Sequence, residues 1–167
     1  MFVFGHLGFG HQLAQPWRQR LPRWPLALGM LLPDLIDKPL YYSRVSDFIS
    51  CTRTIGHTSL LCLALFALGF AFRKRALVAV GLGVVTHLAL DLTLDVLTDD
   101  TVKTTWIAMT WPFRNGHFAN VYIASIAEHS RRLLTIETMV GEIVGIALLF
   151  WDYRRTRHAI PRPVETT

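Results

Sequence analysis

The sequence predicts an all-α protein: an integral membrane helical bundle with about three long apolar helices, plus short N-terminal and interfacial helices. Of its 167 residues, 51% are hydrophobic and only 17% are charged, whereas an ordinary soluble domain has about 25% charged residues. The apolar residues are also clustered, and residues 76–97 reach the ~17–25 residues that a membrane-spanning helix needs. The alternative is a soluble all-α protein in which the same segments are buried core helices.

The N-terminal part is expected to contain short helices and an interfacial loop. Residues 2–14 are apolar and Gly-rich and are expected to form a short helix. Residues 15–25 hold three prolines, two tryptophans and three arginines. This composition is typical of a loop at the membrane surface, because proline breaks helices and tryptophan favours the interface. A short apolar helix is expected over residues 26–32, ending at the proline of LLPDLIDKP.

Two long apolar helices are expected next, over residues 58–72 and 76–97, joined by the basic sequence Arg73-Lys74-Arg75. A second basic cluster, residues 154–157, follows the last apolar run. Basic residues at the ends of apolar helices are typical of contact with anionic headgroups on the cytoplasmic side. Both clusters therefore favour a cytoplasmic location for these helix ends.

The C-terminal part is expected to be mixed in character and to end in another apolar helix. Residues 98–136 include a short helix around 121–134, and the last helix is expected over 136–154. The chain contains no repeat and no low-complexity linker. Residues 1–155 therefore form a single membrane-embedded helical domain, and residues 156–167 a disordered tail.

The charge balance indicates the class of partner. The net charge is +5, but the basic residues do not form one stripe, which disfavours nucleic acid and favours membrane lipids. Two cysteines, Cys51 and Cys62, form neither a disulfide framework nor a C-x-x-C metal site. The sequence is compatible with a homo-oligomer.

A polar stripe interrupts the apolar stretch VVTHLALDLTLD. His87, Asp91 and Asp95 are spaced by four residues and therefore share one helix face. Ionisable residues in a membrane helix normally face the bundle interior and mark a functional site. The plainer alternative is a His–Asp hydrogen bond that only holds helices together.

Counting along the predicted hairpin places other polar residues at the same level. His57 lies 17 residues before Lys74, and Asp91 lies 17 residues after it. If the turn is tight, these two side chains lie at the same height. Aligning the basic end of the last helix with Lys74 places Glu137 near the same level. Converging histidines and carboxylates favour a zinc site.

Two N-terminal segments could also reach this site. LLPDLID contains Asp34 and Asp37 at the end of the short helix, and FGHLGFGH contains His6 and His11. The glycines around His6 permit close approach of the backbone to a ligand. An ordinary polar helix end and lone histidines on an apolar face are the alternatives.

The motifs GHLGFG, LLPDLID, RTIGHTSL, THLALD and WPF occur in this order. In that order they resemble a family of small membrane-bound, metal-dependent hydrolases, also described as LexA-binding, inner-membrane-associated hydrolases. The resemblance covers about residues 6–113. It implies a prokaryotic inner-membrane protein that is distantly similar to zinc-dependent phospholipases C and single-strand nucleases.

The resemblance also implies a set of metal ligands. His6 would bind a second ion, with Asp91 as a bridge, and Asp37 competes with Asp34 for one role. The relatives have a second H-x-x-x-D pair, but here His117 is followed four residues later by Val121 and His129 by Leu133. One or two ions are therefore expected. The first, complete metal position would consist of Asp34, His57, His87 and Asp91.

The predicted activity is hydrolysis of a phosphodiester or phospholipid-like substrate by metal-activated water. Asp34 or Asp37 would orient the water, Arg53 would bind a phosphate, and Glu137 would complete the metal sphere or act as a base. Three alternatives remain open from the sequence. They are a structural metal site in a non-enzymatic membrane protein, a haem held by His57 and His87, and a proton-coupled transporter.

Overall fold

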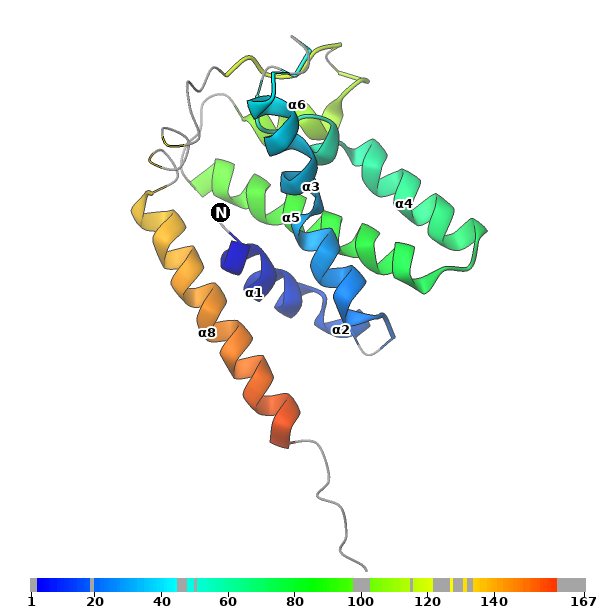
Figure 1. Cartoon of the computed structure of the whole chain (residues 1–167), viewed down its shortest axis with the longest axis vertical. Coiled ribbons are helices and arrows are strands. Elements are labelled where there is room, and N and C mark those ends of the chain that lie inside the picture. Colours follow the sequence, from blue (N-terminus) through cyan, green and yellow to red (C-terminus); the bar gives the residue numbers. More distant parts are fainter. Residues whose placement is uncertain are drawn as a thin grey trace, which may run out of the picture.

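The structure is a computed structural model in which every regular element is a helix (Figure 1). This confirms the all-α prediction for the described part of the chain. It describes residues 3–18, 20–44, 48–49, 51–97, 103–114, 116–121, 127, 131 and 134–158. The elements are α1 (Val3–Leu13), α2 (Gln15–Arg18), α3 (Arg23–Tyr42), the 3-10 turn η1 (Ile55–His57), α4 (Ser59–Ala71), α5 (Arg75–Leu97), α6 (Thr104–Thr110) and α8 (Ile136–His158).

Within the described ranges, α5 is the one helix long and apolar enough to cross a membrane. α4 is apolar but shorter, and more than half of the apolar window of α5 is buried inside the protein. A core helix of a soluble protein has the same properties. The expected bundle of three long membrane helices is therefore confirmed only as an all-α fold with one candidate span.

α3 is longer than the sequence indicated. The predicted helix over residues 26–32 was expected to end at Pro33, but α3 continues to Tyr42 with Pro33 and Pro39 inside it. A proline inside a helix removes one backbone hydrogen bond and crowds the preceding turn. Packing against α5 compensates here, and the oxygen of the Met30 carbonyl accepts a hydrogen bond from His87 Nδ1 at 2.7 Å.

α3 and α5 cross in backbone contact because glycines lie at the crossing. A Cβ atom on Gly29 would lie 2.1 Å from the Val80 oxygen, and one on Gly83 would lie 2.3 Å from the Leu26 oxygen. Any larger residue would separate the two helices. This close crossing brings the carboxylates of α3 to the polar stripe of α5.

α4 and α5 form the antiparallel hairpin that the sequence predicted. The turn is tight, and the Lys74 N–H donates to the Gly69 oxygen at 2.8 Å. Thr58 caps the start of α4, since its side chain accepts from the Leu61 N–H at 3.2 Å. His57 directly precedes this cap and therefore lies beside α5.

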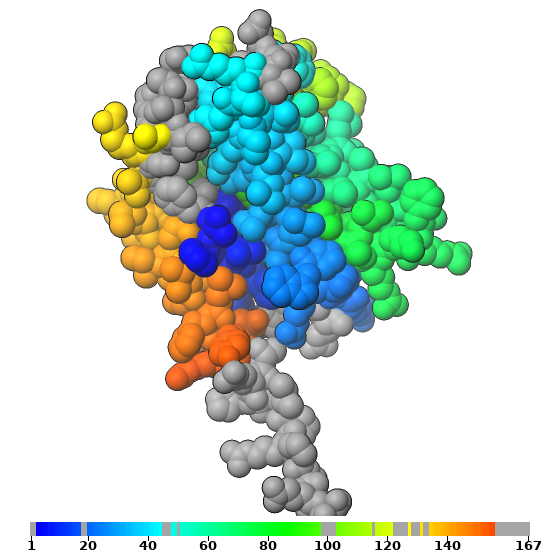
Figure 2. Space-filling model, viewed as in Figure 1, coloured from blue at the N-terminus to red at the C-terminus, as the bar shows by residue number. Residues whose placement is uncertain are grey.

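α8 packs chiefly against α1 and forms one flank of the molecule, opposite the α4–α5 turn (Figures 1 and 2). Gly8 and Gly145 lie at this crossing, where a Cβ on Gly8 would lie 2.2 Å from the Gly145 oxygen. α8 extends to His158, past the predicted boundary of the domain. Most of the predicted helix at 121–134 and residues 159–167 of the predicted tail lie outside the described residues.

Candidate metal centre

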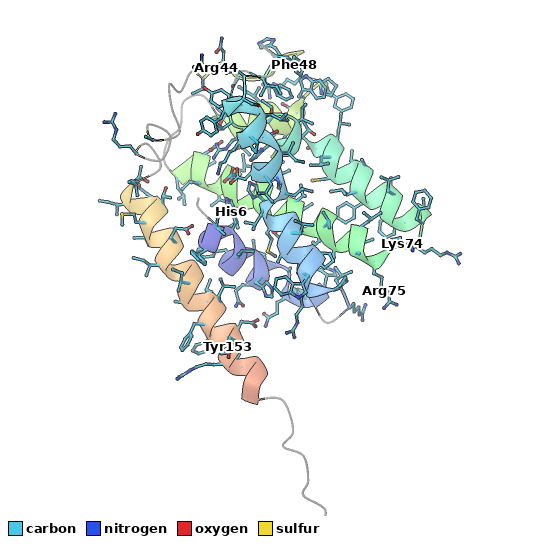
Figure 3. All side chains as sticks on the ribbon, viewed as in Figure 1. His6, Arg44, Phe48, Lys74, Arg75 and Tyr153 are labelled. Carbon is cyan, nitrogen blue, oxygen red and sulfur yellow. The ribbon has the colours of Figure 1, made fainter. Side chains whose placement is uncertain are left out.

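Four elements bring histidine and aspartate side chains together inside the protein. α1, η1 and α5 each contribute a histidine that is at most 1% exposed. Burying polar rings is costly unless their nitrogens have partners. His6 marks the place where α1 meets α3 and α5 (Figure 3). The group comprises His6 of α1, Asp34 and Asp37 of α3, His57 of η1, and His87 and Asp91 of α5.

Asp37 fixes the orientation of His57. Its Oδ2 lies 2.7 Å from His57 Nδ1 and also accepts the Thr54 N–H at 2.6 Å. Its Oδ1 accepts from the Thr54 hydroxyl at 3.0 Å and from the Gly56 N–H at 2.8 Å. Because a carboxylate oxygen only accepts, Nδ1 carries a proton, and in the neutral ring Nε2 keeps its lone pair. These four hydrogen bonds use the acceptor capacity of Asp37, so it positions His57 instead of orienting a water.

His87 is held in the same tautomer by the backbone of α3. Its Nδ1 lies 2.7 Å from the Met30 carbonyl oxygen, which can only accept, so Nδ1 carries the proton. Its Nε2 lies 3.2 Å from His57 Nε2. Two lone pairs therefore face each other at hydrogen-bond distance, an arrangement that requires a cation or a proton between them.

A carboxylate completes this triangle. Asp91 Oδ2 lies 3.5 Å from His57 Nε2 and 3.8 Å from His87 Nε2. Four ligands placed tetrahedrally around an ion at ~2.0–2.1 Å would be about 3.3 Å apart. Asp34 Oδ1, 3.9 Å from His57 Nε2, lies nearby as a fourth candidate ligand. Buried histidine and aspartate groups that could hold a metal ion are thus present at the predicted position.

A second group overlaps the first. His6, Asp34 and His87 also approach closely enough to share an ion. His87 offers only one nitrogen, because its Nδ1 is bound to Met30, so it serves one ion at a time. Neither ring nitrogen of His6 has a hydrogen-bond partner among the described residues. Its Nε2 lies 3.4 Å from Oδ1 of Asp91, the residue to which the resemblance gives a bridging role.

The environment keeps His6 neutral. Burial, with a contribution from the stacked His87 ring at 3.9 Å, lowers the pKa of His6 to about 3. A neutral imidazole has one nitrogen with a free electron pair, as a metal ligand requires. His6 is therefore suited to donate to an ion.

The net charge of the side chains around the triangle is suited to a divalent ion. Two cations lie among the carboxylates: Lys38 Nζ is 2.6 Å from Asp34 Oδ2, and Arg53 Nε is 3.0 Å from Asp91 Oδ2. With the histidines neutral, four ionised carboxylates against two cations leave two negative charges, which one divalent ion balances. The carboxylates are Asp34, Asp37, Asp91 and Asp95.

Arg53 supports a ligand from behind. Its Nη1 donates to Asp95 Oδ1 at 2.6 Å and to the Thr104 hydroxyl at 2.9 Å, while its Nε contacts Asp91. Asp95 also accepts the Thr105 N–H at 3.1 Å. Asp95, the third member of the predicted stripe, thus supports Arg53 and belongs to neither metal-binding group. Arg53 was predicted to bind a phosphate. In the structure its Nε and Nη1 contact the carboxylates of Asp91 and Asp95 instead.

Glu137 lies apart from this cluster. Its side chain at the start of α8 is exposed and belongs to neither metal-binding group. The register estimate assumed that α8 lies beside the α4–α5 hairpin, whereas α8 packs on α1. A different acid of α8, Glu142, bonds the start of α1, and an acid in an apolar helix is the signal by which it could have been found.

The geometry does not suit the haem alternative. The Nε2 atoms of His57 and His87 are 3.2 Å apart and share their triangle with Asp91, so no porphyrin plane fits between them. The two rings are also nearly perpendicular, with centroids 5.1 Å apart. The two histidines are arranged to meet at one point.

No family model, curated protein or solved structure matches the chain. The resemblance of its motifs to membrane-bound hydrolases therefore stays a prediction. What the described residues establish is an all-α fold with a buried histidine and aspartate cluster.

Proposed function

We propose that the protein is a membrane-bound, metal-dependent hydrolase that acts on a phosphodiester or phospholipid-like substrate. One observation supports the metal site in particular. Three electron-pair donors lie within 3.8 Å of one another: His57 Nε2, His87 Nε2 and Asp91 Oδ2. The tautomers of both rings are set by acceptors behind them, the usual arrangement around a protein-bound metal. The hydrolase activity and the prokaryotic inner-membrane location are supported by the resemblance.

Zinc suits this donor set best. Two imidazole nitrogens with carboxylate oxygens are typical zinc ligands, and the separations in the triangle approach tetrahedral spacing. Magnesium and calcium prefer ligands that are all oxygen. His6, with the second oxygen of Asp91, offers the start of another position, which is consistent with one or two ions.

The protein's own residues supply the rest of the site. Asp37 and the Met30 carbonyl hold the two imidazoles, and Arg53 holds Asp91. The more exposed side chains are Asp34 and Lys38, at 21% and 29%, which marks this edge of the cluster as the approach for substrate and water. When bound there, zinc lowers the pKa of a water molecule toward ~7 and polarises the phosphorus centre. Lys38 lies at this edge, where an anionic substrate would approach, whereas Arg53 is engaged by Asp91 and Asp95.

A structural metal site and a shared proton are the competing assignments. Burial lowers the pKa of His57, but hydrogen bonds to Asp37 and Asp91 outweigh burial and raise it, so a proton competes for Nε2. A closed four-ligand site would favour a structural ion, and an exchangeable water would favour catalysis. Asp34 decides between the closed and the open site. Its Oδ2 is engaged by Lys38, so only its Oδ1 can act as the fourth ligand or leave that position to water.

The test combines metal analysis with hydrolysis. Protein purified in detergent is analysed for bound metals and assayed with bis(4-nitrophenyl) phosphate and with phosphatidylcholine vesicles. We expect about one zinc per chain in the native protein and a loss of zinc in His87→Ala, because this ring is common to both groups. His117→Ala, the same change at an exposed histidine, is the matched control.

Each result has a separate meaning. Unchanged metal content in His87→Ala would remove the metal centre. Zinc that is lost in His87→Ala, without hydrolysis of either substrate by the native protein, would support the structural metal site instead. Native protein without bound metal, even after incubation with zinc, would favour the shared proton.

A further inference from the structure

The outer face of α8 is apolar from the first turn of the helix nearly to its end. Ile136 is 80% exposed, and Ile143 is 64% exposed. Large apolar faces on a protein surface mark contacts with a partner or a membrane. The large apolar and aromatic side chains exposed on α8 are Ile136, Met139, Val140, Ile143, Val144, Ile146, Phe150, Trp151 and Tyr153.

Three acidic residues lie in this stretch. Glu137, in the first turn, is exposed, whereas Glu142 and Asp152 are turned toward α1. Glu142 Oε2 and Oε1 accept the Phe4 and Gly5 N–H groups at 3.0 and 2.8 Å. Asp152 Oδ2 lies 3.7 Å from His11 Nδ1. By composition the three acids exclude α8 from the candidate spans, but the outward surface between residues 138 and 151 carries no charged residue. Only the structure separates the two faces.

The uncharged outer surface of α8 ends in polar groups on both sides, as expected at a bilayer. From residue 138 to 151 it rises ~20 Å at 1.5 Å per residue, about two thirds of the ~30 Å hydrocarbon core, with the exposed Glu137 at its N-terminal end. The C-terminal end carries aromatic and basic residues together: the Arg155 guanidinium lies 5.1 Å from the Trp151 ring. Such pairs are typical of the headgroup region.

The basic end of α8 agrees in direction with that of α5. Lys74 and Arg75, at the start of α5, are labelled on the right, and Tyr153, near the end of α8, is labelled below, whereas Arg44 and Phe48 lie at the top (Figure 3). One bilayer orientation therefore places both basic ends at the same headgroup layer. Anionic lipid would complement Arg154 and Arg155 there.

We propose that α8 lies against the bilayer as a second membrane helix, with its outer face in lipid hydrocarbon and its basic end at an anionic headgroup layer. The proposal rests on the membrane location given under the proposed function. It adds a link between lipid and the metal centre, because Glu142 holds the first turn of α1, next to His6. The lipid-facing helix and the buried histidine thus belong to one packed unit.

A nitroxide at position 146 tests the proposal. Burial raises the pKa of both native thiols, Cys51 and Cys62, to about 11, so they label poorly at neutral pH and Ile146→Cys supplies the reactive thiol. The full chain is reconstituted in vesicles of phosphatidylcholine and phosphatidylglycerol. Electron paramagnetic resonance then measures the collision of the label with oxygen, which enters lipid, and with a nickel chelate, which stays in water.

We expect oxygen to relax the label at position 146 several-fold more than the nickel chelate does, and the reverse for Glu137→Cys, the exposed control at the helix start. Nickel access at 146 equal to that at 137 would place this face in water and overturn the proposal. Low access to both reagents would mean a protein cover, with dipolar broadening if it is a second copy, and would also overturn it. Zinc content of the labelled protein reports on the metal centre separately.

Discussion

Asp37→Asn tests whether the residue behind His57 tunes the metal centre. The substitution keeps the size of the side chain but replaces one acceptor oxygen by an N–H₂ donor. The amide oxygen can take the place of Oδ2 and keep the contacts with His57 Nδ1 and the Thr54 N–H, at 2.7 and 2.6 Å in the native protein. The amide nitrogen then faces the Gly56 N–H, a donor against a donor.

The expected loss of zinc affinity is about 10-fold, or ~1.4 kcal/mol, the lower end of the ~10–100-fold range for such supporting residues. It is the lower end because His57 keeps its tautomer and loses only the negative charge behind it. Competition with a chromogenic zinc chelator measures the affinity. Thermal melting in excess chelator shows whether the variant is folded.

Asp152→Asn is the matched control, because it makes the same change beside His11 at the far end of α1. We expect its zinc affinity to equal that of the native protein. A folded Asp37→Asn variant with native affinity would refute the reasoning, as would an equal loss in Asp152→Asn.

Three other predictions concern stability. Gly83→Ala places a Cβ 2.3 Å from the Leu26 oxygen, so we expect the free energy of unfolding to fall by ~1–3 kcal/mol, as measured by melting in detergent. The control, Gly116→Ala, has open space around it and should melt like the native protein. Glu142→Ala removes two charge-assisted hydrogen bonds to α1. We expect the free energy of unfolding to fall by ~1.5–3 kcal/mol and amide hydrogen exchange in the first turn of α1 to become faster. Unchanged exchange there would contradict the contact. Removing zinc with a chelator should lower the melting temperature, since zinc at 100 times its Kd stabilises the folded state by ~2.7 kcal/mol; a melting temperature that does not depend on zinc would count against a folded-state site.

The hairpin count located His57 beside Asp91 because a tight turn leaves the chain only one register. The same count failed for Glu137, because the long segment before α8 carries no register information and α8 packs on α1. The inward acid, Glu142, depends on that packing partner. Sequence spacing therefore predicts contacts within a hairpin and not between helices joined by long connections.

The path of α3 was also beyond the sequence. Pro33 normally ends a helix, and only the close crossing with α5 at Gly83 shows why the helix continues here. The hydrogen-bond partner of His87 is a backbone carbonyl, and since every residue has one, residue types cannot predict this contact. Side-chain patterns predicted which residues meet, and the backbone determines how they are oriented.

The Met30 carbonyl has a consequence for how this centre can change. Every amino acid at position 30 carries the same carbonyl group, so no substitution there deletes the acceptor that orients His87. Its position depends instead on the path of α3 around Pro33. A single substitution at Asp37 removes the hydrogen-bond partner of His57. The partner of His87 is a main-chain carbonyl, and it is lost only if the path of α3 changes.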